Sequence, residues 1–171
     1  MALDVNYWLQ PALVDPRTYG LFFLLGSFTV ASLSDIRRMS AQSEFLHIWI
    51  LALLALFVLD VYLISSLQGD RFAFKWGAIA LFSLLSYRGV GLIFKLEWGD
   101  VAAITAVCGL LSALMVPIFF LILIGCNLVM VPMLRNFGKG NAYPFMPVVT
   151  AATLIAIPAA SYLQTLNIVI G

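Results

Sequence analysis

Hydrophobic residues occur along the chain in six long runs, and the short stretches between them contain most of the charged and polar side chains. An α-helix needs about 20 apolar residues to cross the hydrocarbon core of a bilayer. The pattern therefore predicts an all-α, polytopic integral membrane protein, with residues 1–171 forming a single membrane domain with short loops. The expected spans cover about 19–34, 46–66, 74–94, 101–114, 117–134 and 145–169.

The fourth and fifth expected spans come from one continuous run. No charged residue occurs between Val101 and Leu134. A straight helix over this stretch would be roughly 50 Å long, whereas the hydrocarbon core is about 30 Å thick. We therefore expect a break near Met115-Val116-Pro117. It leaves short pieces, a length that suits a tilted or partly re-entrant segment.

The composition supports a membrane protein and excludes several other classes. Hydrophobic residues make up 63% of the 171 residues and charged residues only 10%, whereas soluble domains contain about 25% charged residues. A net charge of +1 without a basic stripe argues against a nucleic-acid partner and leaves the lipid bilayer as the expected surrounding. Cys108 and Cys126 lie inside apolar runs, and His47 is the single histidine. We expect no metal site, no cofactor and no catalyst of the Ser-His or Cys-His type.

Lysine and arginine residues indicate the orientation, because they are enriched on the cytoplasmic side of membrane proteins. With six spans and both termini outside, five basic residues fall in inside segments and three in outside segments. We therefore predict a multi-pass plasma-membrane protein with its N- and C-termini outside. The inside residues are Arg37, Arg38, Lys95, Arg135 and Lys139, and the outside residues are Arg17, Arg71 and Lys75.

Two aspartates stand at span ends that should face the same side. Asp35 closes the first span, and Asp100 opens the fourth. Spans two and three lead out and back, so both carboxyl groups are expected at the inside face at similar depth. Asp60 is about 21 Å into the second span and should lie out of their reach, near the opposite face.

A pair of neighbouring carboxyl groups can share one proton and hydrolyse a peptide bond. The ionised group takes a proton from water, and the protonated group donates one to the peptide carbonyl. Each aspartate also has a simpler explanation. Asp35, followed by Arg37 and Arg38, suits an ordinary span end, and Asp100 suits a helix N-cap. Their expected position on one face favours a catalytic dyad of Asp35 and Asp100.

Three short motifs carry a family resemblance. They are residues 34–38 (Ser-Asp-Ile-Arg-Arg), residues 99–101 (Gly-Asp-Val) and residues 143–147 (Tyr-Pro-Phe-Met-Pro). With the six-span layout, they resemble the type IV prepilin and preflagellin peptidases, membrane aspartyl proteases of the Gly-x-Gly-Asp class. The resemblance implies an aspartic endopeptidase in which Asp35 and Asp100 are catalytic. It also implies cleavage of a short basic leader from prepilin- or preflagellin-like substrates at the cytoplasmic membrane face.

The chain departs from this family's pattern at several positions. Glu97 replaces the first glycine of Gly-x-Gly-Asp, and Ala102 replaces a lysine that often follows the aspartate by two residues. The Ile-Pro-Asn that often follows the first aspartate is missing from residues 39–45. The sequence also contains no cysteine-rich insert of the kind that accompanies methyltransferase activity. It therefore resembles the short archaeal or tight-adherence-pilus members, which have peptidase activity alone.

Two further features bear on the substrate and on an alternative function. Glu44 and Glu97 are expected on the same side as the dyad, where they would attract a basic leader. The alternative is a non-enzymatic membrane protein, either a small transporter or a subunit of a larger assembly. In that case Asp60, Arg88 and the glycine-rich third span would line a polar path.

Overall fold

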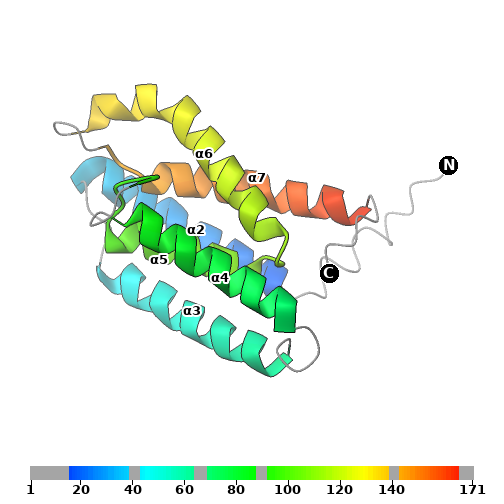
Figure 1. Cartoon of the computed structure of the whole chain (residues 1–171). Helices are drawn as coiled ribbons and strands as arrows, with labels where there is room; N and C mark the ends of the chain where they lie inside the picture. Colours follow the sequence, from blue (N-terminus) through cyan, green and yellow to red (C-terminus); the bar gives the residue numbers. More distant parts are fainter. Residues whose placement is uncertain (1–15, 39–42, 64–68, 88–91, 139–142, 166–171) are drawn as a thin grey trace, which may run out of the picture.

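The computed structural model describes residues 16–38, 43–63, 69–87, 92–138 and 143–165. Within these ranges the chain is all-α, as predicted, with six α-helices and one short 3-10 helix (Figure 1). The helices are α2 (Pro16–Arg38), α3 (Ser43–Leu63), α4 (Gly69–Ser86), α5 (Trp98–Leu110), α6 (Met115–Leu134), η1 (Arg135–Phe137) and α7 (Met146–Thr165).

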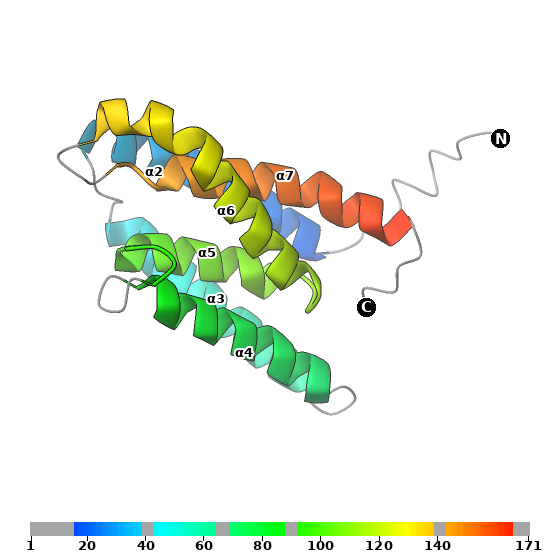
Figure 2. The ribbon, with the colours of Figure 1, turned by 45° about the horizontal axis from the view of Figure 1, so that its top comes forward.

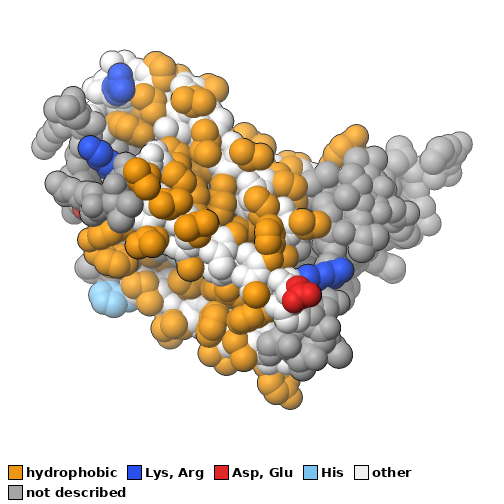
Figure 3. Space-filling model, viewed as in Figure 1, with side chains coloured by type: hydrophobic (Ala, Val, Ile, Leu, Met, Phe, Trp, Pro, Cys, Tyr) orange, Lys and Arg blue, Asp and Glu red, His pale blue; other side chains and the backbone are white. Residues whose placement is uncertain are grey.

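Three helices are long and apolar enough to cross a membrane, by their length and composition. These segments are Tyr19–Arg37, Phe45–Tyr62 and Met115–Phe137. Two shorter apolar helical segments, Trp98–Leu110 and Met146–Ala160, accompany them. Hydrophobic side chains cover most of the face drawn in Figure 3, and charged side chains lie toward its two ends. This surface suits a membrane protein, because lipid tails solvate apolar side chains and leave charges to the headgroup regions.

Helix α5 is the centre of the bundle. Every residue from Val101 to Leu110 is buried, and α5 contacts each of the other α-helices. Helices α3 and α4 lie on one side of it, and α2, α6 and α7 on the other (Figure 2). Successive helices alternate in direction in both views, so the C-terminus of α2 and the N-termini of α5 and α7 lie at the same end of the bundle. We call this end the α5 N-terminal end.

Small residues let other helices approach α5 closely. A Cβ atom added at Gly109 would lie 3.0 Å from Cδ1 of Leu56 in α3, and one added at Gly20 of α2 would lie 3.0 Å from Cδ2 of Leu110. Larger side chains at these two positions would push α2 and α3 away from the central helix.

The described helices correct several expected boundaries. Helix α4 begins at Gly69 and ends at Ser86, whereas the expected span was 74–94. The next described residues, Leu92 and Ile93, lie back against the end of α4, where their N–H groups donate to the carbonyl of Leu85. The Leu96 N–H then donates to the carbonyl of Ser86, which holds the start of α5 against the end of α4.

The break between the fourth and fifth expected spans also lies earlier than predicted. Helix α5 ends at Leu110, and α6 begins at Met115 and contains Pro117 in its first turn. A proline is tolerated there because the first N–H groups of a helix have no partner within the helix. Helix α5 thus starts three residues before the expected position 101, and α6 starts two residues before the expected position 117. The break between them lies at residues 111–114 rather than at 115–117.

Candidate functional site

Asp35 lies in the last turn of α2 and is buried, with 8% of its surface exposed. Its Oδ2 atom accepts a hydrogen bond of 3.1 Å from the backbone N–H of Met146, the first residue of α7. The backbone of Phe145 provides a second hydrogen bond to the carboxyl group. The first amides of a helix have no partner within the helix and carry its positive dipole end. Asp35 therefore caps α7 from the end of α2.

A second contact between α2 and α7 fixes their register. The hydroxyl groups of Ser32 and Thr150 are hydrogen-bonded at 2.8 Å. Ser32 is one turn before Asp35, and Thr150 is one turn after Met146, so the two contacts follow the same helix pair. The position of Asp35 is thus set by a packed helix pair rather than by a loop.

Asp100 lies in the first turn of α5. The helix begins at Trp98, and Glu97 occupies the N-cap position in an extended conformation, with φ −86° and ψ 168°. The expectation that Asp100 itself could be the N-cap residue is therefore wrong. Its carboxyl group instead accepts a hydrogen bond from the backbone of Glu97, which is the reciprocal half of a capping box.

The structure brings three carboxyl groups together at the α5 N-terminal end. Asp35 and Asp100 are close enough to interact electrostatically, and Glu97 interacts with both. The side chain of Glu97 is exposed. Glu44 lies in the first turn of α3, but its side chain is outside the described residues. Asp35, Glu97 and Asp100 thus meet across α2 and α5, whereas nothing is established for Glu44.

The aromatic rings of Phe94, Tyr143 and Phe145 lie next to one another near these carboxyl groups. The ring of Phe145 is 5.4 Å from that of Phe94 and 6.3 Å from that of Tyr143, between ring centroids. The Tyr143 hydroxyl donates a hydrogen bond of 2.7 Å to Oδ1 of Asn127. Burial raises the pKa of the Tyr143 phenol above its ordinary value, and the nearby charge of Asp100 acts in the same direction. Tyr143 therefore stays protonated beside the site.

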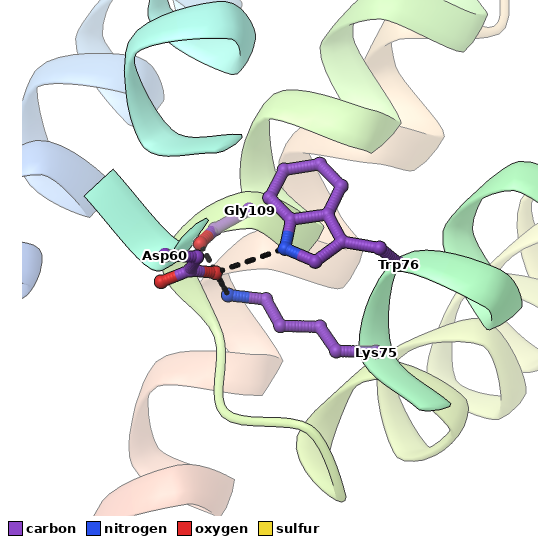
Figure 4. A network of polar contacts seen from close by, with 4 residues as sticks. All are labelled: Asp60, Lys75, Trp76 and Gly109. Atoms are coloured by element: carbon purple, nitrogen blue, oxygen red, sulfur yellow. Dashed lines mark hydrogen bonds and ion pairs between the residues drawn. The ribbon is translucent and has the colours of Figure 1, made fainter. Parts of the chain in front are cut away.

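A separate polar network lies toward the other end of α5 (Figure 4). Lys75 Nζ is 2.6 Å from Oδ2 of Asp60 and donates a second hydrogen bond, of 2.7 Å, to the backbone carbonyl of Gly109. The Trp76 indole N–H donates to the same Asp60 oxygen at 3.2 Å. Gly109 is nine residues beyond Asp100, roughly 13 Å along the helix axis. As expected, Asp60 is remote from the other two aspartates.

Lys75 corrects one part of the orientation argument. It was counted as a basic residue of an outside segment, but it lies inside α4 with 2% of its surface exposed. The sequence contained an indication of this ion pair, because Asp60 and Lys75 lie in two successive antiparallel helices at positions that can face each other. Arg88, the other residue of the expected polar path, lies outside the described residues.

Comparison of the chain with protein-family models, curated proteins and solved structures found no match. Within the described part of the chain, no three His, Cys, Asp or Glu residues are grouped as metal ligands would be. The site consists of two buried or half-buried aspartates from different helices, a third carboxylate at the surface, and neighbouring aromatic rings.

Proposed function

We propose that the chain is a membrane-embedded aspartyl endopeptidase that cleaves the short basic leader of prepilin- or preflagellin-like substrates. One observation carries the proposal. Asp35 and Asp100, 65 residues apart in sequence, interact electrostatically at one end of the bundle. Two carboxyl groups close enough to influence each other are the minimum that acid–base hydrolysis of a peptide bond by an aspartate pair requires.

In this proposal the six described helices lie in the membrane, with α5 ending inside the bundle, and the α5 N-terminal end faces the cytoplasm. Arg37, Lys95 and Arg135 belong to this end, which agrees with the enrichment of basic residues on the cytoplasmic side. Because Lys75 is buried in an ion pair, it no longer counts against this orientation. Both termini then lie outside.

The two aspartates take different roles. Asp35 accepts N–H hydrogen bonds from the start of α7. These bonds and the positive end of the helix dipole stabilise a negative charge on its carboxylate. Asp100 also lies at a helix N-terminus but accepts one backbone bond, from Glu97, whereas Asp35 accepts two. We therefore assign Asp35 as the ionised member of the pair, which takes a proton from the attacking water. Asp100 is the protonated member, which donates its proton to the oxygen of the scissile carbonyl.

The reaction then completes with the same two groups. Water adds to the carbonyl carbon and gives a tetrahedral diol, with one proton on Asp35 and Asp100 ionised. Asp35 passes its proton to the leaving nitrogen as the carbon–nitrogen bond breaks, and Asp100 recovers a proton from the diol. Both groups return to their starting states, and no other reactant is consumed.

The surroundings of the pair fit a substrate with a basic leader followed by an apolar helix. Glu97 is exposed beside the aspartates, and its negative charge attracts lysine and arginine side chains. The half-buried ring of Phe94 packs on the buried ring of Phe145, and its exposed part gives an apolar surface near Asp35. The substrate helix would pack against this surface, with the leader extending past Glu97.

The proposal is tested by incubating membranes that contain the protein with a prepilin-like substrate and sequencing the product by mass spectrometry. The expected product lacks the leader. Its N-terminal residue is the first residue of the apolar segment or the one directly before it. A matched substrate, in which neutral residues replace the leader's basic ones, should be cleaved more slowly. If no substrate in a panel of prepilin and preflagellin leaders is cleaved, the proposed function is wrong.

A further inference from the structure

The C-terminus of α5 requires an explanation, because the helix is too short to reach the other side of a bilayer. Its 13 residues span roughly 20 Å, against a hydrocarbon core of about 30 Å. Leu110 and Leu111 are buried, with 9% and 3% of their surfaces exposed. The last carbonyl groups of α5 therefore end inside the bundle, where water does not supply their missing hydrogen bonds.

Lys75 of α4 supplies one of these bonds. Its ammonium group donates to the carbonyl of Gly109 in the last turn of α5 (Figure 4). A positive charge at this position also stabilises the negative end of the helix dipole. A buried ammonium group needs an opposite charge, and Asp60 of α3 provides it at 2.6 Å. Trp76 donates to the same carboxylate and holds it in place.

The polar network joins three helices at the end of α5. The Asp60–Lys75 ion pair joins α3 to α4 across the last turn of α5. Gly109 lacks a side chain, so Leu56 of α3 packs directly on the backbone there. The Lys75 hydrogen bond to the Gly109 carbonyl therefore forms where α5 is in direct contact with α3. An axial shift of α5 would break this hydrogen bond.

We propose that Asp60 and Lys75 form a clamp that fixes the axial position of α5 and thereby holds Asp100 at its working distance from Asp35. The inference rests on the proposed peptidase function, and both clamp residues are positioning residues. Backbone hydrogen bonds connect successive turns of a helix. An axial shift at Gly109 would therefore also move Asp100 at the other end of α5. A displacement of 1 Å at a catalytic group can lower a rate by about 100-fold.

Cys108 provides a local test that does not depend on catalysis. It is fully buried beside Gly109, whereas Cys126 lies half-buried in α6. In a Cys126→Ser background, we compare maleimide labelling of Cys108 in the native protein and in the Asp60→Asn/Lys75→Met double variant. This variant removes both buried charges together, so it leaves no unpaired charge in the interior.

The proposal predicts that the double variant labels Cys108 at least about 10-fold faster, because the free end of α5 opens transiently. Labelling of Cys126, measured in a Cys108→Ala background, should be unchanged. An unchanged Cys108 rate would overturn the proposal. Equal acceleration at both cysteines would overturn it as well, since the pair would then hold the whole bundle rather than the end of α5.

Leader cleavage tests the second half of the inference. The double variant should lower kcat by about 100-fold with KM nearly unchanged, and Lys75→Arg, which keeps the cation, should retain most of the rate. If Cys108 opens while kcat stays at the wild-type value, the clamp does not position Asp100. If the wild-type protein cleaves no leader, the peptidase proposal fails, whereas the Cys108 result still decides whether the clamp exists.

Discussion

The buried ion pair between Asp60 and Lys75 leads to a strong prediction about stability. Lys75→Met would leave the Asp60 carboxylate in the interior without its cation, and removal of one partner of a buried pair costs about 3–5 kcal/mol. Asp60→Asn would leave the Lys75 ammonium uncompensated, with a cost in the same range of about 3–5 kcal/mol. The stability losses of the two single variants should thus add up to roughly 6–10 kcal/mol.

The double variant should lose far less. Asn at position 60 can still accept the Trp76 indole hydrogen bond, and no buried charge remains. The main loss is the partner of the Gly109 carbonyl, worth about 1–3 kcal/mol for an unsatisfied buried acceptor. The double-mutant cycle should therefore show a coupling of at least about 3 kcal/mol.

The assay is denaturant unfolding in mixed micelles, followed by far-ultraviolet circular dichroism, for the native protein and the three variants. Additive losses, with the double variant as unstable as the sum of the singles, would refute the reasoning. They would mean that the two charges are solvated independently rather than neutralised by each other.

Three further predictions concern other contacts. Asp35→Asn keeps an acceptor for the first amides of α7 and should unfold like the native protein, whereas Asp35→Ala should cost about 0.5–2 kcal/mol; equal stabilities would contradict the capping role. Trp49→Phe removes the indole bond to the Ser27 hydroxyl, and should destabilise by at least about 0.5–1.5 kcal/mol in the same unfolding assay. A stability equal to that of the native protein would show that this bond contributes nothing. Burial raises the pKa of Tyr143 in the folded state, so its contribution to stability is fully present below the ordinary value of 10.0 and is lost as the pH rises through the folded value. Tyr143→Phe should remove this loss above pH 10.0, and an unchanged pH profile would show that another group titrates.

The sequence pattern was sufficient to predict the six α-helices of the described residues in their observed order. It located helix interiors well, because long apolar runs leave little choice of structure in a membrane. It was poorer at helix ends. The expected span began at residue 74, whereas α4 begins at Gly69, because its first turn contains glycine and the charged residues Asp70 and Arg71 rather than apolar ones. Pro117 suggested a break at 115–117, although proline is accommodated in the first turn of α6.

The candidate site was predictable only in part. Counting spans was enough to expect Asp35 and Asp100 at one end of the bundle. The bond from Asp35 to Met146 joins residues 111 positions apart, and no local pattern indicates it. The place of Asp100 within the helix also escaped prediction, because the choice of Glu97 as N-cap depends on how the preceding segment returns to α4. Packing between distant segments decides such details.

The most direct test of the central claim is the rate of leader cleavage in membranes by Asp35→Asn and Asp100→Asn, compared with the native protein. Asp70→Asn is the matched control, because Asp70 also lies in the first turn of a helix but at the start of α4, and is exposed. If the two aspartates act as acid and base, each dyad variant should lose at least about 100-fold in rate, and Asp70→Asn should cleave like the native protein. A dyad variant that cleaves at the native rate would contradict the proposed mechanism.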